Sequence, residues 1–212
     1  MLSKVALFDI DKTIIRRDSM FLFLKYGLAA KPRSAIHLPA LAWNLLLYKL
    51  GIMPAEKAKQ FFFRSIAYMD EGDLEAFYDR VLVPEMYQDA LAEMRSRKKL
   101  GYRVLLVTAS PVAYMKYFKK LGCVDEVLGT ELQRRNGCYT HLIEGKNCKA
   151  EEKVARIRDY LERHQLEIDY EASCAYSDCI SDLPMLEMVG QRYLIRNAPI
   201  KQEDLEVIRW NS

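Results

Sequence analysis

The sequence predicts an α/β fold, a doubly wound and mostly parallel sheet interrupted by an inserted helical cap. Short apolar runs alternate with segments of helical periodicity in the second half of the chain, which is typical of parallel strands joined by helices. A long stretch with helical patterns follows the first apolar run. With 212 residues, half of them apolar, the chain is long enough for one core domain that carries an insert.

Four apolar runs are predicted as buried strands, namely residues 5–8, 104–107, 174–176 and 193–195. Four segments are predicted as the helices of the core, namely residues 86–100, 112–121, 151–163 and 183–188. Gly101 follows the first of these helices, where a left-handed C-cap is expected. Ser110 and Pro111 precede the second, as an expected N-cap and first helical residue.

Two insertions interrupt this alternation. Residues 15–84 are predicted to form the helical cap, too long for a loop, and residues 1–14 with 85–212 to form the core. Within 128–143, Asn136-Gly137 between alternating polar and apolar residues predicts a β-hairpin. The tail after Arg196 carries no clear assignment.

Composition narrows the classes of partner. The net charge of +3, from 32 basic and 29 acidic residues, is too small for a nucleic-acid-binding footprint, so no nucleic-acid partner is expected. The five cysteines are odd in number and include no C-x-x-C pair, which favours free thiols in a reducing, cytoplasmic setting. The three histidines are scattered and are interpreted as structural or surface residues.

One stretch raises the question of a membrane. Residues 34–48 carry no charge and are rich in leucine. The stretch is shorter than the roughly 18 to 20 residues that a spanning helix needs, so a span is not expected. A buried helix and a helix lying on a membrane surface both fit the pattern, and peripheral membrane association through 34–48 stays an alternative.

Paired carboxylates follow the first predicted strand. Asp9 and Asp11 lie where that strand ends, so the turn can bring both side chains to the carboxyl edge of the sheet, where open α/β sheets place ligands. Two close carboxylates repel one another and need a cation or a shared proton. A hard cation with oxygen ligands, Mg²⁺, would serve.

Three further features follow a strand or open a helix. Thr108 and Ala109 precede a helix N-terminus, where a hydroxyl and free N–H groups form a phosphate cradle. Lys153 lies near the start of a helix, where a cation is unfavourable without a partner; Lys146 and Lys149 are its competitors. Asp178 and Asp182 frame the turn after the third strand, although Asp182 could instead cap the next helix. The features are, in order, Asp9-Ile10-Asp11-Lys12-Thr13, Thr108, Lys153 and Asp178-Cys179-Ile180-Ser181-Asp182.

Together these motifs resemble the haloacid dehalogenase (HAD) superfamily, in the branch of phosphoserine phosphatases with a helical cap. The resemblance implies a Rossmann-like core, Asp9 as nucleophile, and Asp11 as general acid and base. It further implies Mg²⁺ held by Asp9, the main-chain carbonyl of Asp11 and Asp178, with Asp182 behind them. The phosphate-binding residues that it implies are Thr108, Ala109, Lys153 and Ser181, the last where the family often has asparagine.

The expected function is therefore Mg²⁺-dependent hydrolysis of a phosphomonoester through an aspartyl-phosphate, with a small phosphorylated metabolite as substrate. Asp18 stands where phosphoserine phosphatases usually have glutamate, and Thr108-Ala109-Ser110 where they have Ser-Gly-Gly, which argues against phosphoserine. The alternatives are a phospholipid phosphatase of the phosphatidylglycerophosphatase type and a phosphomutase. A dehalogenase or a receiver domain has no use for Asp11. The oligomeric state is not predicted.

Overall fold

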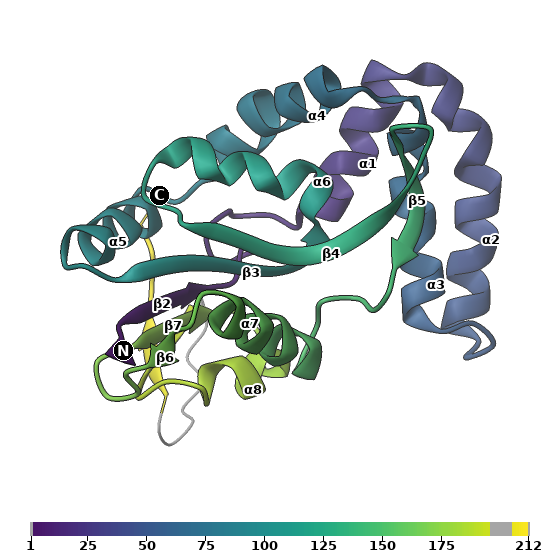
Figure 1. The fold of residues 1–212 in the computed structure, drawn as a ribbon. Coiled ribbons are helices and arrows are strands. Elements are labelled where there is room, and N and C mark those ends of the chain that lie inside the picture. Colours follow the sequence, from purple (N-terminus) through teal and green to yellow (C-terminus); the bar gives the residue numbers. More distant parts are fainter. Residues whose placement is uncertain (1, 196–204, 212) are drawn as a thin grey trace.

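A seven-stranded sheet forms the centre of the protein (Figure 1). The computed structural model describes residues 2–195 and 205–211. Neighbouring strands pair in parallel except at one edge, where β4 and β5 are antiparallel. In spatial order the strands are β5 (Cys138–Glu144), β4 (Glu126–Arg135), β3 (Arg103–Pro111), β2 (Val5–Phe8), β7 (Cys174–Ser177), β8 (Gln191–Ile195) and β9 (Glu206–Ile208). A separate short parallel pair joins β1 (Leu2–Ser3) to β6 (Glu167–Ile168). The predicted α/β class is confirmed.

Both faces of the sheet are covered, which explains why its strands read as continuous apolar runs. Successive residues of a strand point to opposite faces. In β2, Val5 and Leu7 belong to the core cluster on one face, and Ala6 and Phe8 to the cluster on the other. All four are fully buried. Figure 1 shows α7 and α8 on one side of the sheet and α5 and α6 on the other.

The helices of the core lie close to their predicted positions. They are α5 (Gln88–Lys99), α6 (Val112–Met115) with η5 (Lys116–Leu121), α7 (Glu151–Arg163), and η6 (Ile180–Asp182) with α8 (Leu183–Leu186). Gly101 has a φ of 82°, as expected for the residue after α5. The N-cap predicted at Ser110 is wrong, because β3 continues to Pro111 and α6 begins only at Val112. The Ser110 hydroxyl donates to Asp11 instead.

A helical insertion follows β2. Its elements are α1 (Ser19–Ala30), η1 (Pro32–His37), α2 (Leu38–Lys49), α3 (Ala55–Gln60), η2 (Phe61–Tyr68), α4 (Glu71–Phe77), the π-helix η3 (Tyr78–Leu82) and η4 (Val83–Glu85). Close packing of α1 on η2 requires glycine at position 27, where a Cβ would lie 2.2 Å from the Ser65 Oγ. The predicted helical character is confirmed, and division of the chain into a core and a cap at 15–84 stays a proposal.

The hairpin predicted within 128–143 is formed by β4 and β5. Asn136 and Gly137 have φ values of 51° and 80°, the left-handed conformations of a type I′ turn. The sequence predicted only the hairpin, but the start of β4 also pairs in parallel with β3. The far end of β5 reaches the helical insertion, where the Ile143 N–H donates to Gln60 at 3.3 Å. The hairpin thus extends the sheet and contacts the insertion.

Two further expectations concern the membrane and the cysteines. Within residues 2–195 and 205–211, no helix is long and apolar enough to cross a membrane. All five cysteines are free thiols. In the tail, where no assignment was made, β9 adds an edge strand; residues 196–204 lie outside the described part.

Candidate active site

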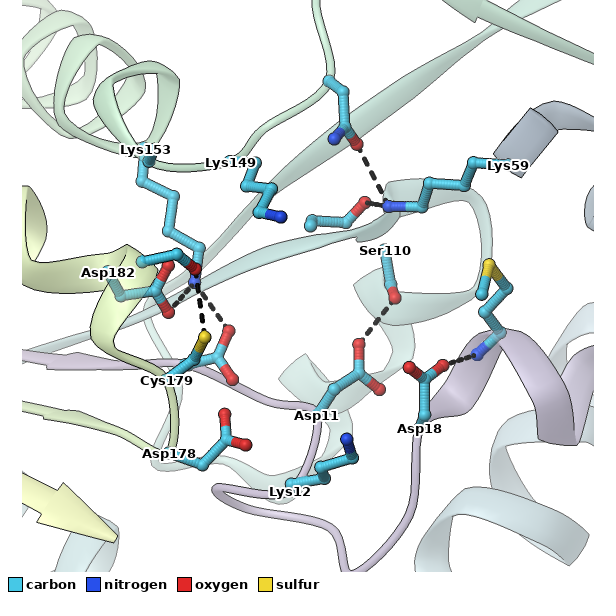
Figure 2. Close-up of a pocket in the computed structure, with 16 residues that line it drawn as sticks. Asp11, Lys12, Asp18, Lys59, Ser110, Lys149, Lys153, Asp178, Cys179 and Asp182 are labelled. Carbon is cyan, nitrogen blue, oxygen red and sulfur yellow. Dashed lines mark hydrogen bonds and ion pairs between the residues drawn. The ribbon is translucent and has the colours of Figure 1, made fainter. Parts of the chain in front are cut away.

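A pocket of about 680 Å³ opens at the carboxyl ends of β2 and β7. These strands are neighbours, and the chain leaves them in opposite directions, β2 toward β3 and β7 toward β8. Such a reversal leaves a crevice at the strand ends. The pocket is lined by every predicted site residue except Thr108. Figure 2 shows Asp11, Lys153, Asp178 and Asp182 converging on it from separate elements.

Thr13 fixes the relative position of two of the carboxylates. Its hydroxyl donates to Asp9 Oδ2 at 3.2 Å and accepts the N–H of Asp178 at 2.9 Å. The Asp9 N–H donates to the carbonyl of Tyr176 at 2.9 Å, which ties the end of β2 to β7. Lys12, with a φ of 61°, lies in the turn after β2, between Asp11 and Thr13. The threonine of the D-x-D-x-T motif therefore joins the first motif to the last.

Lys153 is a buried cation held between two carboxylates. Its Nζ lies 2.6 Å from Asp9 Oδ1 and 2.7 Å from Asp182 Oδ2, and all three side chains are almost inaccessible to solvent. Burial disfavours the charged ammonium, but the two carboxylates outweigh this and raise the pKa of Lys153. Asp182 also accepts the hydroxyl of Ser177 at 2.7 Å. The Asp182 side chain makes no N-cap hydrogen bond to α8, so the capping alternative does not hold.

Asp11 has a different environment from Asp9. The Ser110 hydroxyl donates to its Oδ2 at 2.7 Å, and the Ser19 N–H donates to its Oδ1 at 2.7 Å. Burial is the largest influence and, together with the nearby carboxylate of Asp18, raises the pKa of Asp11 in spite of these donors. Asp18 itself caps α1 by accepting the Met20 N–H at 2.9 Å. A carboxyl group with a raised pKa is suited to give up and take back a proton.

The pocket is lined by more aspartates than lysines, so its carboxylates are not fully neutralised by the protein. The pKa of Asp9 is raised to about 7, mainly by burial and in part by the charges of Asp182 and Asp11, although Lys153 lowers it. The pKa of Asp178 is raised to about 6, mainly by burial, although the charge of Lys12 lowers it. Such a site attracts a cation in addition to its lysines.

The oxygen donors of the pocket fit a hard cation that takes only one or two ligands from protein side chains and the rest from water and substrate. Within the described ranges, no three side chains of His, Cys, Asp or Glu are grouped to hold a metal ion. Zinc sites need three or four such side chains. Mg²⁺ is commonly held by one or two carboxylates, with waters and substrate phosphate completing its shell. Asp9 and Asp178 offer such a pair.

Three predicted phosphate-binding residues differ in whether they reach the pocket. Ala109 and Ser181 line the pocket. Thr108 is fully buried, and its hydroxyl accepts the N–H of Ser110 at 3.0 Å. The structure therefore brings Thr108 behind the pocket wall, where it orders the turn that presents Ala109. The binding of phosphate by any of the three stays a prediction.

A lysine that the sequence did not single out enters the pocket from the helical insertion. Lys59 of α3 donates to the Ala109 carbonyl at 2.6 Å and to Asn147 Oδ1 at 3.0 Å (Figure 2). Both acceptors are neutral, and burial lowers the pKa of Lys59. Asn147 and the same carbonyl also accept the hydroxyl of Thr130, at 3.0 and 2.7 Å. No local pattern marks Lys59, because its partners lie 50 and 88 residues away.

Burial and contacts distinguish Lys153 from the two lysines that competed with it in the sequence. Lys149 also lines the pocket but is exposed, and Figure 2 shows its side chain between those of Lys153 and Lys59. Lys146 is exposed and its carbonyl accepts Arg156 at 3.0 Å. Of the three lysines compared, Lys153 makes the contacts to the carboxylates.

The fold and site define a doubly wound α/β protein whose paired aspartates face a buried lysine at the carboxyl edge of the sheet. The chain belongs to the haloacid dehalogenase-like hydrolase family, whose model matches residues 6–187. It is similar to Protein CicA of Caulobacter vibrioides, with 29% identity over 190 residues that cover 87% of this chain and 82% of CicA.

Two solved structures have the same fold. A protein of unknown function from Bordetella pertussis Tohama I has a TM-score of 0.80 and 27% identity, covering 94% of this chain and 92% of that one. A phosphoserine phosphatase, solved as an analogue of its phospho-aspartyl intermediate, has a TM-score of 0.66 and 18% identity, covering 98% of this chain and 93% of that one. The second likeness is one of fold alone.

Proposed function

We propose that this protein is a Mg²⁺-dependent phosphomonoester hydrolase that works through an aspartyl-phosphate and acts on a small phosphorylated metabolite. The observation that carries the proposal is the pairing of Asp9 with Lys153 at 2.6 Å beside a second carboxyl group, Asp11, whose pKa is raised. Membership of the hydrolase family and the fold shared with a phosphoserine phosphatase support it.

In the first step, an Asp9 carboxylate oxygen attacks phosphorus and the ester oxygen leaves. Asp9 is held for this by Thr13 and Lys153. The transferring phosphoryl group carries charge on its outer oxygens, so catalysis depends mostly on placement and on nearby positive charge. Lys153 supplies one such charge. A Mg²⁺ ion bound by Asp9 and Asp178 would neutralise charge on nucleophile and phosphate.

The leaving oxygen needs a proton, and Asp11 is placed to give it. Its raised pKa keeps the carboxyl group protonated at a higher pH than an exposed aspartate would allow. Once ionised, the same group takes a proton from water, which attacks the aspartyl-phosphate and releases inorganic phosphate. The donors from Ser110 and Ser19 hold it in one orientation through both steps.

The test is release of phosphate in the presence of Mg²⁺ from a panel of phosphoserine, sugar phosphates, nucleotides and a phosphatidylglycerophosphate in detergent. Asp9→Asn should abolish turnover of every ester. Asp159→Asn, an exposed aspartate on α7, is the matched control and should leave turnover unchanged. Turnover of any ester by Asp9→Asn would overturn the mechanism, and turnover of the lipid alone would overturn the substrate class.

A trapping experiment separates hydrolysis from group transfer. With p-nitrophenyl phosphate, whose leaving group needs no proton, Asp11→Asn should accumulate a phosphoprotein that hydroxylamine cleaves, and the Asp9→Asn/Asp11→Asn double variant should not. Recovery of the phosphoryl group on another position of the substrate, rather than as inorganic phosphate, would identify a mutase.

A further inference from the structure

Helix α2 is mostly apolar, with Asn44 and Lys49 as exceptions, but the protein covers only part of its apolar surface. Leu41 and Asn44 are buried, and Leu45 packs against the core cluster. Trp43, Leu46 and Leu50 follow the three- and four-residue spacing of one helical face, and each is exposed. Figure 1 shows α2 on the outer side of the insertion, with α1 and α3 between it and the sheet. A helix face made of large apolar side chains is normally covered by another element.

The exposed apolar side chains continue beyond both ends of α2. Seven of the fifteen large exposed hydrophobic side chains in the described ranges fall within residues 36–52, and we call them the α2 face. Its members are Ile36, Leu38, Trp43, Leu46, Tyr48, Leu50 and Ile52. Ile36, Trp43 and Ile52 are 76%, 60% and 68% exposed. Single exposed apolar residues are ordinary, but a concentration of this kind indicates an interaction surface.

The segment that carries the α2 face contains charges of one sign only. Residues 19–54 contain four basic residues and no acidic one, in a chain with 29 acidic residues. Lys31 is paired with Asp73 at 2.7 Å. Lys25, Arg33 and Lys49 are exposed, and none of them makes an ion pair within the described part of the chain. Arg33 and Ile36 lie three residues apart on a 3₁₀-helix, so their side chains share one side of it.

This charge pattern distinguishes the two chemistries that could cover the face. A symmetric pair of copies would place the same patch against itself and bring like charges together. An anionic lipid surface complements Lys and Arg, and Trp and Tyr are favoured where headgroups meet acyl chains. α2 has 12 residues, and no described helix is long and apolar enough to cross a bilayer. An in-plane contact satisfies both limits.

We propose that the α2 face docks this protein on an anionic membrane surface, with α2 lying in the plane of the headgroups. Trp43 and Leu46 enter the apolar boundary, and Arg33 and Lys49 contact lipid phosphates. In the docked state, lipid covers the exposed apolar side of this helix. This surface lies outside the pocket and does not rest on the proposed function, so activity on a soluble ester and binding to vesicles are separate measurements.

The experiment is co-sedimentation of the full chain with vesicles of equal parts phosphatidylglycerol and phosphatidylcholine, and with vesicles of phosphatidylcholine alone. The wild type should bind the anionic vesicles more tightly, and added salt should weaken that binding. Trp43→Ser/Leu46→Ser should lower the partition coefficient by about tenfold or more. Arg33→Glu/Lys49→Glu should remove the preference for anionic lipid. Leu100→Ser is the matched control, because Leu100 is 63% exposed at the basic end of α5, and should bind as the wild type does.

Fluorescence reports the contact directly. The chain has two tryptophans, so Trp210→Phe leaves Trp43 as the sole emitter. Its emission should move to shorter wavelength on adding anionic vesicles. Equal binding by wild type and Trp43→Ser/Leu46→Ser would overturn the proposal, as would no binding of the wild type to anionic vesicles. A shift that depends on protein concentration without lipid, with dimers in sedimentation, would assign the face to a second copy and also overturn it.

Discussion

The ammonium of Lys153 lies 2.6 Å from Asp9 and 2.7 Å from Asp182, so a single buried cation joins the start of α7 to the end of β2 and to η6. Two carboxylates and one ammonium leave a net negative charge on almost fully buried side chains at the base of the pocket. Lys153 stabilises the two carboxylates without a metal ion. The negative charge that remains could be neutralised by a bound cation. We therefore expect both the stability and the proposed chemistry of this site to depend on Lys153.

Lys153→Met should abolish turnover and lower the free energy of unfolding by about 3–5 kcal/mol, because two buried carboxylates lose their cation. Denaturant unfolding and phosphate release measure the two effects. Lys149→Met, at an exposed lysine of the same pocket, should leave stability unchanged. Adding Asp182→Asn to Lys153→Met should recover part of the lost stability but none of the activity. Full stability in Lys153→Met alone would show that the ion pair contributes little to folding.

Binding of Mg²⁺ should depend on pH through Asp9 and Asp178. Their pKa values of about 7 and about 6 lie above those of exposed aspartates, so each carboxyl group of the folded protein holds its proton to a higher pH. Protons must leave before the cation binds, so affinity should rise as pH increases through this window. The rise in melting temperature on adding Mg²⁺ should be large at about pH 8 and small at about pH 5. Asp178→Asn should reduce the rise in melting temperature at both pH values. A rise that does not depend on pH would contradict the assignment of Asp9 and Asp178 as Mg²⁺ ligands.

Ser110→Ala should move one limb of the pH–rate profile. The Ser110 hydroxyl donates to Asp11 and so lowers the pKa that burial has raised. Without this donor the pKa of Asp11 rises further, and because the acid must be protonated when the ester oxygen leaves, the alkaline limb of kcat/KM should shift upward by up to about one pH unit. Ser96→Ala, at an exposed serine of α5, is the control. A shift of the acid limb, with the alkaline limb unchanged, would mean that the alkaline limb reports a group other than Asp11.

Lys59→Met should weaken turnover through the contact between the helical insertion and the pocket. The substitution removes two hydrogen bonds, to the Ala109 carbonyl and to Asn147, and one cation from the wall. We expect kcat/KM to fall by about 10- to 100-fold, as when hydrogen bonds from a charged donor are lost. Lys57→Met, on the same short helix but exposed, should behave as the wild type does. Unchanged kcat/KM in Lys59→Met would limit the lysine to a structural contact.

The elements of the core were predictable from the sequence because parallel strands buried on both faces are short apolar runs, and β2 and β7 are of this kind. The parallel pairing of β4 with β3 was not, because the hairpin signal at Asn136-Gly137 indicated only the antiparallel partner. Pairing depends on a neighbour distant in the chain, which a local pattern does not contain.

The same limit applies to the site. The sequence by itself determined that Asp9, Asp11 and Asp178 lie at strand ends, because residue type and local position are enough to place a carboxylate at the sheet edge. It left Asp182 open between the site and a helix cap. Only the tertiary structure decided that Lys153, rather than Lys149, contacts Asp9 and Asp182. It also decided that Thr13 joins Asp9 to Asp178 and that Lys59 enters from the insertion. These contacts span up to 165 residues of sequence, and they are set by how helices pack on the sheet rather than by any spacing within one segment.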